Sequence, residues 1–134
     1  MSYSPIYITA EDRARVEWLM LFYDLFTEEE QKRIRRLYYE VSQGLVVSAD
    51  QIPSNVVTTH SRIKLEEIKG DTEVALYLVF PDEMKQGFGR VSILTAIGAA
   101  LFGRRVGDIV ECQTATGVRR FAITSTKHFN RDSV

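Results

Sequence analysis

The chain has 134 residues, of which 45% are hydrophobic and 26% charged, values that fit a globular domain and exclude a disordered or fibrous chain. Its 17 Lys and Arg residues nearly balance its 18 Asp and Glu residues, so the net charge of −1 argues against a broadly basic nucleic-acid-binding surface. The single cysteine, Cys112, excludes an internal disulfide, and the separation of His60 from His128 does not fit a zinc motif.

The first 44 residues carry the period of an α-helix. Apolar residues recur at steps of three and four positions in the first run, at Val16, Leu19, Met20 and Tyr23. Thr27 and Glu30 have the spacing of a capping box and open a second helix, which Gly44 is expected to end. Because only a few residues join the two runs, an antiparallel helical hairpin is predicted over residues 1–44. The stretch 18–26 has more apolar residues than one hairpin seam requires, so part of it is expected to meet another surface.

Residues 45–55 contain a cluster of turn-forming side chains and are predicted to form a linker, with one short helical turn after Ser48. Beyond it the hydrophobic period changes to two, which is typical of β-strands. A segment of small and apolar residues at 96–102, ended by Gly103, predicts one short helix. Strands are expected at residues 62–66, 74–80, 90–93, 109–114 and 118–126. This order predicts an α+β domain over residues 56–129, followed by a tail of residues 130–134.

No motif for catalysis is evident in the chain. The glycines near positions 87 and 98 do not form a phosphate-binding fingerprint, and no nucleophile is paired with a base. Cys112 falls within a predicted strand and is interpreted as a small core residue, and His60 as a structural or surface residue. We therefore expect a protein that is not an enzyme, with no cofactor and no metal site.

One local cluster offers a functional interpretation, the acids Asp24, Glu28, Glu29 and Glu30 at the turn of the predicted hairpin. A structural explanation is also available, because the helix dipole favours acids in a first turn and Glu30 belongs to the capping box.

The amino end lacks the basic and apolar segments of a secretory signal. The longest apolar-rich stretch, residues 18–26, is too short to span a bilayer, which requires about 20 residues. A cytoplasmic protein with no membrane partner is expected.

Residues 98–108 read Gly-Ala-Ala-Leu-Phe-Gly-Arg-Arg-Val-Gly-Asp and precede the predicted hairpin at residues 110–121. Together with the opening at residues 56–63, these segments resemble the carboxy-terminal domain of the bacterial transcript cleavage factors GreA and GreB, over about residues 56–129. The pattern is most similar to the Rnk subgroup, the regulator of nucleoside diphosphate kinase.

The resemblance implies an FKBP-like antiparallel sheet domain preceded by a short coiled-coil finger, in a protein that binds RNA polymerase near its secondary channel. It implies a channel-entering tip formed by Asp24, Glu28 and Glu29. It also implies a polymerase docking surface at Thr95, Ala96 and Ile97, in which Ala96 stands where the family has a proline.

The expected length of the finger determines whether its tip could reach the active centre of the polymerase and stimulate transcript cleavage. In the Gre factors, acids at the tip of a long finger help to hold the catalytic magnesium of the polymerase. A first helix of about 15 residues spans only about 22 Å at roughly 1.5 Å per residue. We therefore expect a regulator that competes with cleavage-type factors and does not itself stimulate cleavage.

Two alternatives remain. The implied fold also resembles FKBP, which suggests a peptidyl-prolyl isomerase or chaperone, although the only tryptophan, Trp18, lies in the predicted hairpin and not in a sheet pocket. The subgroup name suggests regulation of nucleoside diphosphate kinase through protein binding, but no residue identifies a surface for that kinase. No direct sequence-specific nucleic-acid binding is expected.

Overall fold

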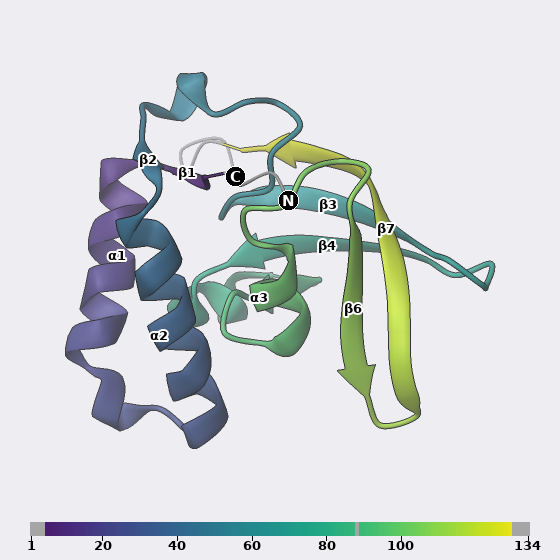
Figure 1. The fold of residues 1–134 in the computed structure, drawn as a ribbon, viewed down its shortest axis with the longest axis horizontal. Helices are drawn as coiled ribbons and strands as arrows, with labels where there is room; N and C mark the ends of the chain where they lie inside the picture. The colour runs from purple at the N-terminus through teal and green to yellow at the C-terminus, as the bar shows by residue number, and fades with distance from the viewer. Residues whose placement is uncertain (1–4, 88, 130–134) are drawn as a thin grey trace. The chain divides into compact units, whose positions relative to one another are not determined.

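The computed structural model describes residues 5–87 and 89–129, and the predicted tail at 130–134 lies outside them. The chain divides into two compact units, Met1–Ile52 and Pro53–Val134, so the division falls within the segment predicted to be a linker. The fold class is α+β, as predicted: a two-helix region followed by a curled sheet with one short helix (Figure 1). No helix in the described ranges combines the length and apolarity needed to cross a membrane.

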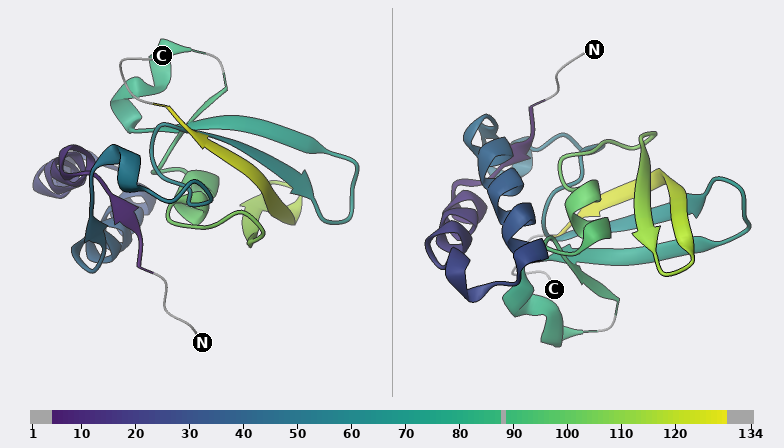
Figure 2. Two further views of the ribbon diagram at one scale, coloured as in Figure 1. Left: turned by 90° about the horizontal axis from the view of Figure 1, so that it is seen from above. Right: turned by 60° about the horizontal axis from the view of Figure 1, so that its bottom comes forward.

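The first unit is a helical hairpin of α1 (Ala10–Leu21) and α2 (Glu28–Ser42), joined by the single 3-10 turn η1 (Tyr23–Leu25). The two helices lie side by side in every view (Figures 1 and 2). The Thr27 hydroxyl accepts a hydrogen bond from the backbone N–H of Glu30, and the Glu30 carboxylate accepts one from that of Thr27. This reciprocal capping box fixes the start of α2.

The seam of the hairpin is apolar, because the buried residues of both helices recur at helical spacing. The buried apolar ones are Val16, Leu19, Ile34, Leu37 and Val41, and Asp12 in the first turn of α1 is buried as well. A short parallel pair, β1 (Tyr7–Ile8) with β2 (Leu45–Val46), joins the two ends of the hairpin, and the N–H of Leu45 donates to the carbonyl of Ile6. The turn η2 (Ala49–Gln51) follows Ser48, where the sequence predicted a helical turn.

The second unit is built on a five-stranded sheet with the order β5-β4-β3-β7-β6. Its strands are β3 (Ser61–Glu67), β4 (Glu73–Val79), β5 (Arg90–Ser92), β6 (Ile109–Thr114) and β7 (Gly117–His128). The sheet is antiparallel, as expected, except at one edge, where β5 runs parallel to β4. After β4 the chain forms the 3-10 helix η3 (Pro81–Gln86), and Pro81, which has no N–H, cannot continue the ladder into a hairpin.

The short helix α3 (Ala96–Leu101) completes the second unit. Figure 2 shows it beside the curled sheet, next to β6. Apolar side chains from the helix, its preceding loop and the sheet are almost wholly buried: Ile63, Leu78, Ile93, Leu94, Leu101 and Ile123. This is the core that holds the candidate surfaces of this unit in place.

Candidate interaction surfaces

The predicted acidic tip lies on the connection between α1 and α2. Asp24 belongs to η1, and Glu28 and Glu29 open the first turn of α2; all three are exposed. Lys32 Nζ lies 3.3 Å from a carboxylate oxygen of Glu29, while no partner is found for Asp24 or Glu28 among the described residues. Because Thr27 and Glu30 supply the capping hydrogen bonds themselves, the three acids contribute to helix stability only through the dipole and the exposed Glu29–Lys32 pair.

Tyr23 anchors this tip to α2. The side-chain amide of Gln31 donates to the carbonyl of Tyr23 at 3.1 Å. Arg35 donates to the Tyr23 hydroxyl, and its guanidinium lies 5.5 Å from the centre of the same ring. These contacts hold η1 in a defined position, so the acids stand on an ordered turn.

An apolar stripe lies beside the acids. The sequence indicated it only as an excess of apolar residues over residues 18–26. Its members follow the helical spacing i, i+3, i+4, i+7 and are Trp18, Leu21, Phe22 and Leu25. Leu21 and Leu25 are 77% and 78% exposed, and the rings of Trp18 and Phe22 stack with centroids 4.5 Å apart. The tip thus presents carboxylates and apolar side chains together.

The predicted docking residues lie at the start of α3. Thr95 is the N-cap: its hydroxyl accepts from the N–H of Gly98 at 3.1 Å and donates to the carbonyl of Ser92 at 2.7 Å. Ala96 occupies the first helical position, where a proline is tolerated but not required. Thr95, Ala96 and Ile97 are half-buried, so part of each is accessible.

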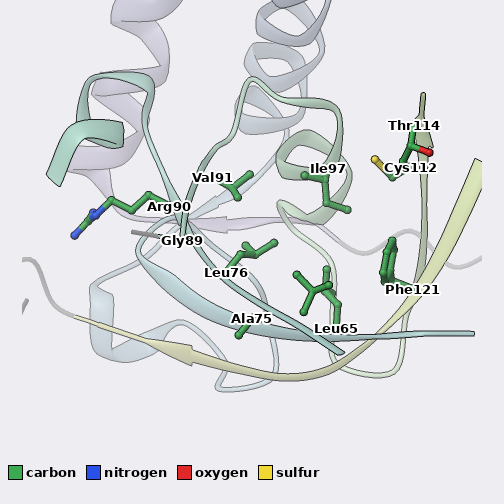
Figure 3. A pocket seen from close by; sticks show the side chains of 11 residues that line it. Leu65, Ala75, Leu76, Gly89, Arg90, Val91, Ile97, Cys112, Thr114 and Phe121 are labelled. Atoms are coloured by element: carbon green, nitrogen blue, oxygen red, sulfur yellow. The ribbon is translucent and has the colours of Figure 1, made fainter. Parts of the chain in front are cut away.

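Ile97 also lines an apolar pocket of about 330 Å³ within the second unit. The side chains of Leu65, Leu76, Ile97 and Phe121 converge on it in Figure 3. Cys112, which the sequence placed in the core, is half-buried at this pocket, and its Sγ lies 3.7 Å from the carbonyl oxygen of Gln113. The lining of this pocket is almost wholly apolar, a feature that the sequence pattern did not reveal.

His60 is structural, in agreement with the sequence interpretation. Its Nε2 lies 2.9 and 3.0 Å from the two carboxylate oxygens of Glu83, and both side chains are buried. One of these oxygens also accepts from the N–H of Phe80 at 3.1 Å. The pair therefore joins the start of β3 to η3, and no group of three or more metal-ligating side chains is found in the described residues.

Comparison with known proteins identifies the family to which the chain belongs. The family model described as "Transcription elongation factor, GreA/GreB, C-term" matches residues 52–128. GreA of Clostridium beijerinckii is 33% identical over 91 residues, which cover 68% of this chain and 57% of that relative. The regulator of nucleoside diphosphate kinase of Escherichia coli is 32% identical over 79 residues, 59% of this chain and 58% of the relative.

These near-equal identities do not distinguish the Rnk subgroup from GreA, and the chain matches less than two thirds of the length of either relative. A solved structure, the prokaryotic transcription elongation factor GreA/GreB from Nitrosomonas europaea, superposes with a TM-score of 0.78 at 27% identity. That superposition covers 94% of this chain and 100% of the other. The chain belongs to the GreA/GreB family of transcription elongation factors.

Proposed function

We propose that the protein binds RNA polymerase near its secondary channel, competes there with cleavage-type elongation factors, and has no catalytic activity of its own. Membership of the GreA/GreB family supports the choice of partner. The finer assignment to an Rnk-like competitor rests on one observation, the short, capped helical hairpin that precedes the family domain. Such a role is carried out in the cytoplasm.

The short length of the hairpin favours competition with cleavage factors and not stimulation of cleavage by the protein itself. Helix α1 has 12 residues and α2 has 15. At about 1.5 Å per residue these helices span about 18 and 22 Å. A finger of this reach presents Asp24, Glu28 and Glu29 at the mouth of the channel, short of the active-centre metal. It would exclude another factor by occupying the entrance.

The second unit is proposed to provide the docking surface through Thr95, Ala96 and Ile97. The hydrogen bonds of Thr95 to Ser92 and Gly98 hold this segment rigid, which lowers the entropy lost on binding. The partly accessible side chains at the start of α3 then form the contact.

The experiment uses backtracked transcription complexes with a cleavage factor and increasing amounts of the protein. Stimulated cleavage should fall as the protein is added, and the protein alone should release no more 3′ fragments than magnesium does. Tagged protein should also recover polymerase subunits from its own cells. Cleavage stimulated by the protein and lost on Asp24→Asn would contradict the proposal.

A peptidyl-prolyl isomerase or chaperone activity is a second candidate, favoured by the apolar pocket that Ile97 and Phe121 line. Trp18 lies in the first unit and does not line this pocket, which weakens the comparison with FKBP. The proline-limited refolding of a model protein distinguishes the two functions. Acceleration by catalytic amounts of the protein would support the isomerase; no acceleration is expected.

A further inference from the structure

Three cations and a tyrosine form a row across four strands of the second unit. Tyr77 is paired in register with Arg90 of β5 on one side and with Arg62 of β3 on the other, and Arg62 is paired with Lys127 of β7. Residues directly opposite one another in a sheet share a face, so all four side chains lie on one side. We call Arg62, Arg90 and Lys127 the basic row. Arg90 is also one of the residues that line the apolar pocket, and in Figure 3 its side chain extends away from Leu65 and Leu76.

Aromatic rings lie beneath two of these cations, Arg90 and Lys127. The guanidinium of Arg90 is 4.8 Å from the centre of the Tyr77 ring, and Lys127 Nζ is 5.5 Å from that of Phe129. The rings of Tyr77 and Phe129 meet edge to face with centroids 6.0 Å apart. Cation–π contacts of this kind hold the charges in place beside flat apolar surfaces.

The cations of the basic row lack ion-pair partners among the described residues. Elsewhere in the same unit arginines have carboxylate partners: Arg119 lies 2.7 Å from Glu67, and Arg120 lies 2.9 Å from Glu111. Within residues 5–87 and 89–129 no ion pair involves Arg62, Arg90 or Lys127.

Arg62 and Lys127 are both exposed and stand directly opposite each other, an arrangement of like charges that is unfavourable without a counter-ion. A bound polyanion would remove this repulsion.

We propose that this face of the sheet binds single-stranded nucleic acid without sequence preference. Three steps between strands about 4.8 Å apart make the row about 14 Å long. Successive phosphates of one strand advance about 3.4 Å along the axis of a duplex and lie further apart through space, so a row of this length faces only a few of them. The guanidinium plane of Arg90, which lies over the Tyr77 ring, and the accessible part of the half-buried Phe129 ring offer surfaces for base stacking. An unpaired strand can use such surfaces and an acidic protein cannot. The low net charge of the chain does not oppose this, because the cations are concentrated locally.

The test measures fluorescence anisotropy of labelled oligouridylate and oligothymidylate with the full chain, over a salt titration and without polymerase. Both oligomers should bind, since no contact on the face distinguishes the two sugars. Three phosphate contacts at about −0.7 each predict a slope of about −2 for log affinity against log salt. In the double variant Arg62→Gln, Lys127→Gln the slope should fall to about −0.7, and the affinity at low salt roughly tenfold.

A matched double variant removes the same charge elsewhere in the unit. Arg104→Gln with Arg120→Gln changes two exposed arginines outside the row and should leave affinity and slope unchanged. Phe129→Leu keeps an apolar side chain but loses the ring, so it should weaken binding several-fold at an unchanged salt slope. Circular dichroism verifies that each variant is folded.

The proposal is overturned if neither oligomer binds at low salt, or if the Arg62/Lys127 variant binds as tightly as the wild type. Equal losses of affinity in the Arg62/Lys127 and Arg104/Arg120 variants would also overturn it. Such a result would show that the oligomer responds to the total charge of the protein and not to the basic row. Displacement of the oligomer by polyglutamate as readily as by unlabelled oligomer would identify an acidic protein as the occupant instead. None of these outcomes touches polymerase binding, which the assay does not include.

Discussion

Gly98 shows at single-residue scale why the family motif contains a glycine at this place in α3. A Cβ at this position would lie 2.1 Å from the carbonyl oxygen of Ser92 and 2.9 Å from Oγ1 of Thr95. The same two groups are hydrogen-bonded to each other, so neither can move away without breaking the cap of the helix. The close approach of α3 to the end of β5 therefore requires a residue without a side chain.

Gly98→Ala should lower the free energy of unfolding by about 3 kcal/mol, because the methyl group forces α3 away from the backbone at Ser92. Denaturant unfolding measures the loss. Ala100→Gly, in the same helix, is the control and should cost only about 1 kcal/mol through helix propensity. Equal losses in the two variants would show that the backbone contact is not this tight.

The buried pair of His60 and Glu83 makes a second prediction at this scale. Glu83→Ala should cost about 3 kcal/mol of stability, since it leaves the imidazole and the N–H of Phe80 buried without this acceptor. Glu83→Gln keeps an oxygen for Phe80 and should lose less. Removing the exposed carboxylate in Glu111→Ala, beside Arg120, should cost under about 1 kcal/mol. A loss for Glu83→Ala no larger than this control would refute the role of the pair.

Glu67 provides a prediction about pH. Two hydrogen bonds from Arg119, at 2.9 and 2.7 Å, hold the pKa of the Glu67 carboxyl below its ordinary value of 4.5. A carboxyl with a lowered pKa stabilises the fold above its ordinary pKa, and this contribution is lost as the pH falls through the lowered value. Arg119→Gln should raise the pKa of the Glu67 carboxyl towards 4.5. NMR titration of the side-chain carboxyl carbon of Glu67 measures this pKa. The control variant Arg120→Gln should leave it unchanged.

At the scale of elements, the residues that stabilise the helical hairpin are different from those that it exposes to a partner. The apolar seam and the capping box of Thr27 with Glu30 hold α1 against α2. Neither device uses Asp24, Glu28 or Glu29, and the apolar stripe formed by Trp18, Leu21, Phe22 and Leu25 also lies outside the seam. The turn can therefore carry charged and apolar contacts for a partner at little cost to the fold.

The triple variant Asp24→Asn, Glu28→Gln, Glu29→Gln tests the acidic tip. Loss of favourable dipole interactions should reduce stability by about 1 to 2 kcal/mol. If the acids enter the polymerase channel, the variant should also compete less well with a cleavage factor, and the wild-type effect should decrease as salt increases. Competition is measured as inhibition of cleavage in backtracked complexes.

The control for the tip is Glu17→Gln with Glu40→Gln, which removes acids from the sides of the same hairpin. It should compete like the wild type. Equal inhibition by the wild type and the folded triple variant at all salt concentrations would assign the tip acids to the helix dipole alone.

At the scale of the whole molecule, the chain divides into two compact units. The family match at residues 52–128 nearly coincides with the second unit, Pro53–Val134. The helical hairpin of α1 and α2 lies wholly outside the match. This division suggests that affinity for polymerase and exclusion of competitors are provided by different units.

Accordingly, the isolated second unit should bind RNA polymerase as well as the full chain in a pull-down, but should compete less with a cleavage factor because it lacks the finger. Circular dichroism and a cooperative thermal transition establish that the isolated unit is folded. Binding by an isolated hairpin and none by the folded second unit would reverse the assignment of the docking surface.

The sequence by itself determined the elements and the family. Caps such as Thr27 with Glu30, apolar residues at helical spacing and strict alternation in β3 are local signals, and local hydrogen bonds and burial form these elements. The exposed position of Asp24, Glu28 and Glu29 also followed from the turn, although their role stays a prediction. The Gly-Ala-Ala-Leu segment carried the resemblance to the GreA/GreB family.

Only the tertiary structure decided which distant segments became neighbours. The parallel pairing of β5 with β4 depends on the path through η3, and no local period encodes it. The basic row likewise exists because the register of four strands aligns Arg62, Arg90 and Lys127 on one face. Strand order and register are fixed by packing between residues far apart in the chain, where a shift of one residue would move each of these cations to the opposite face.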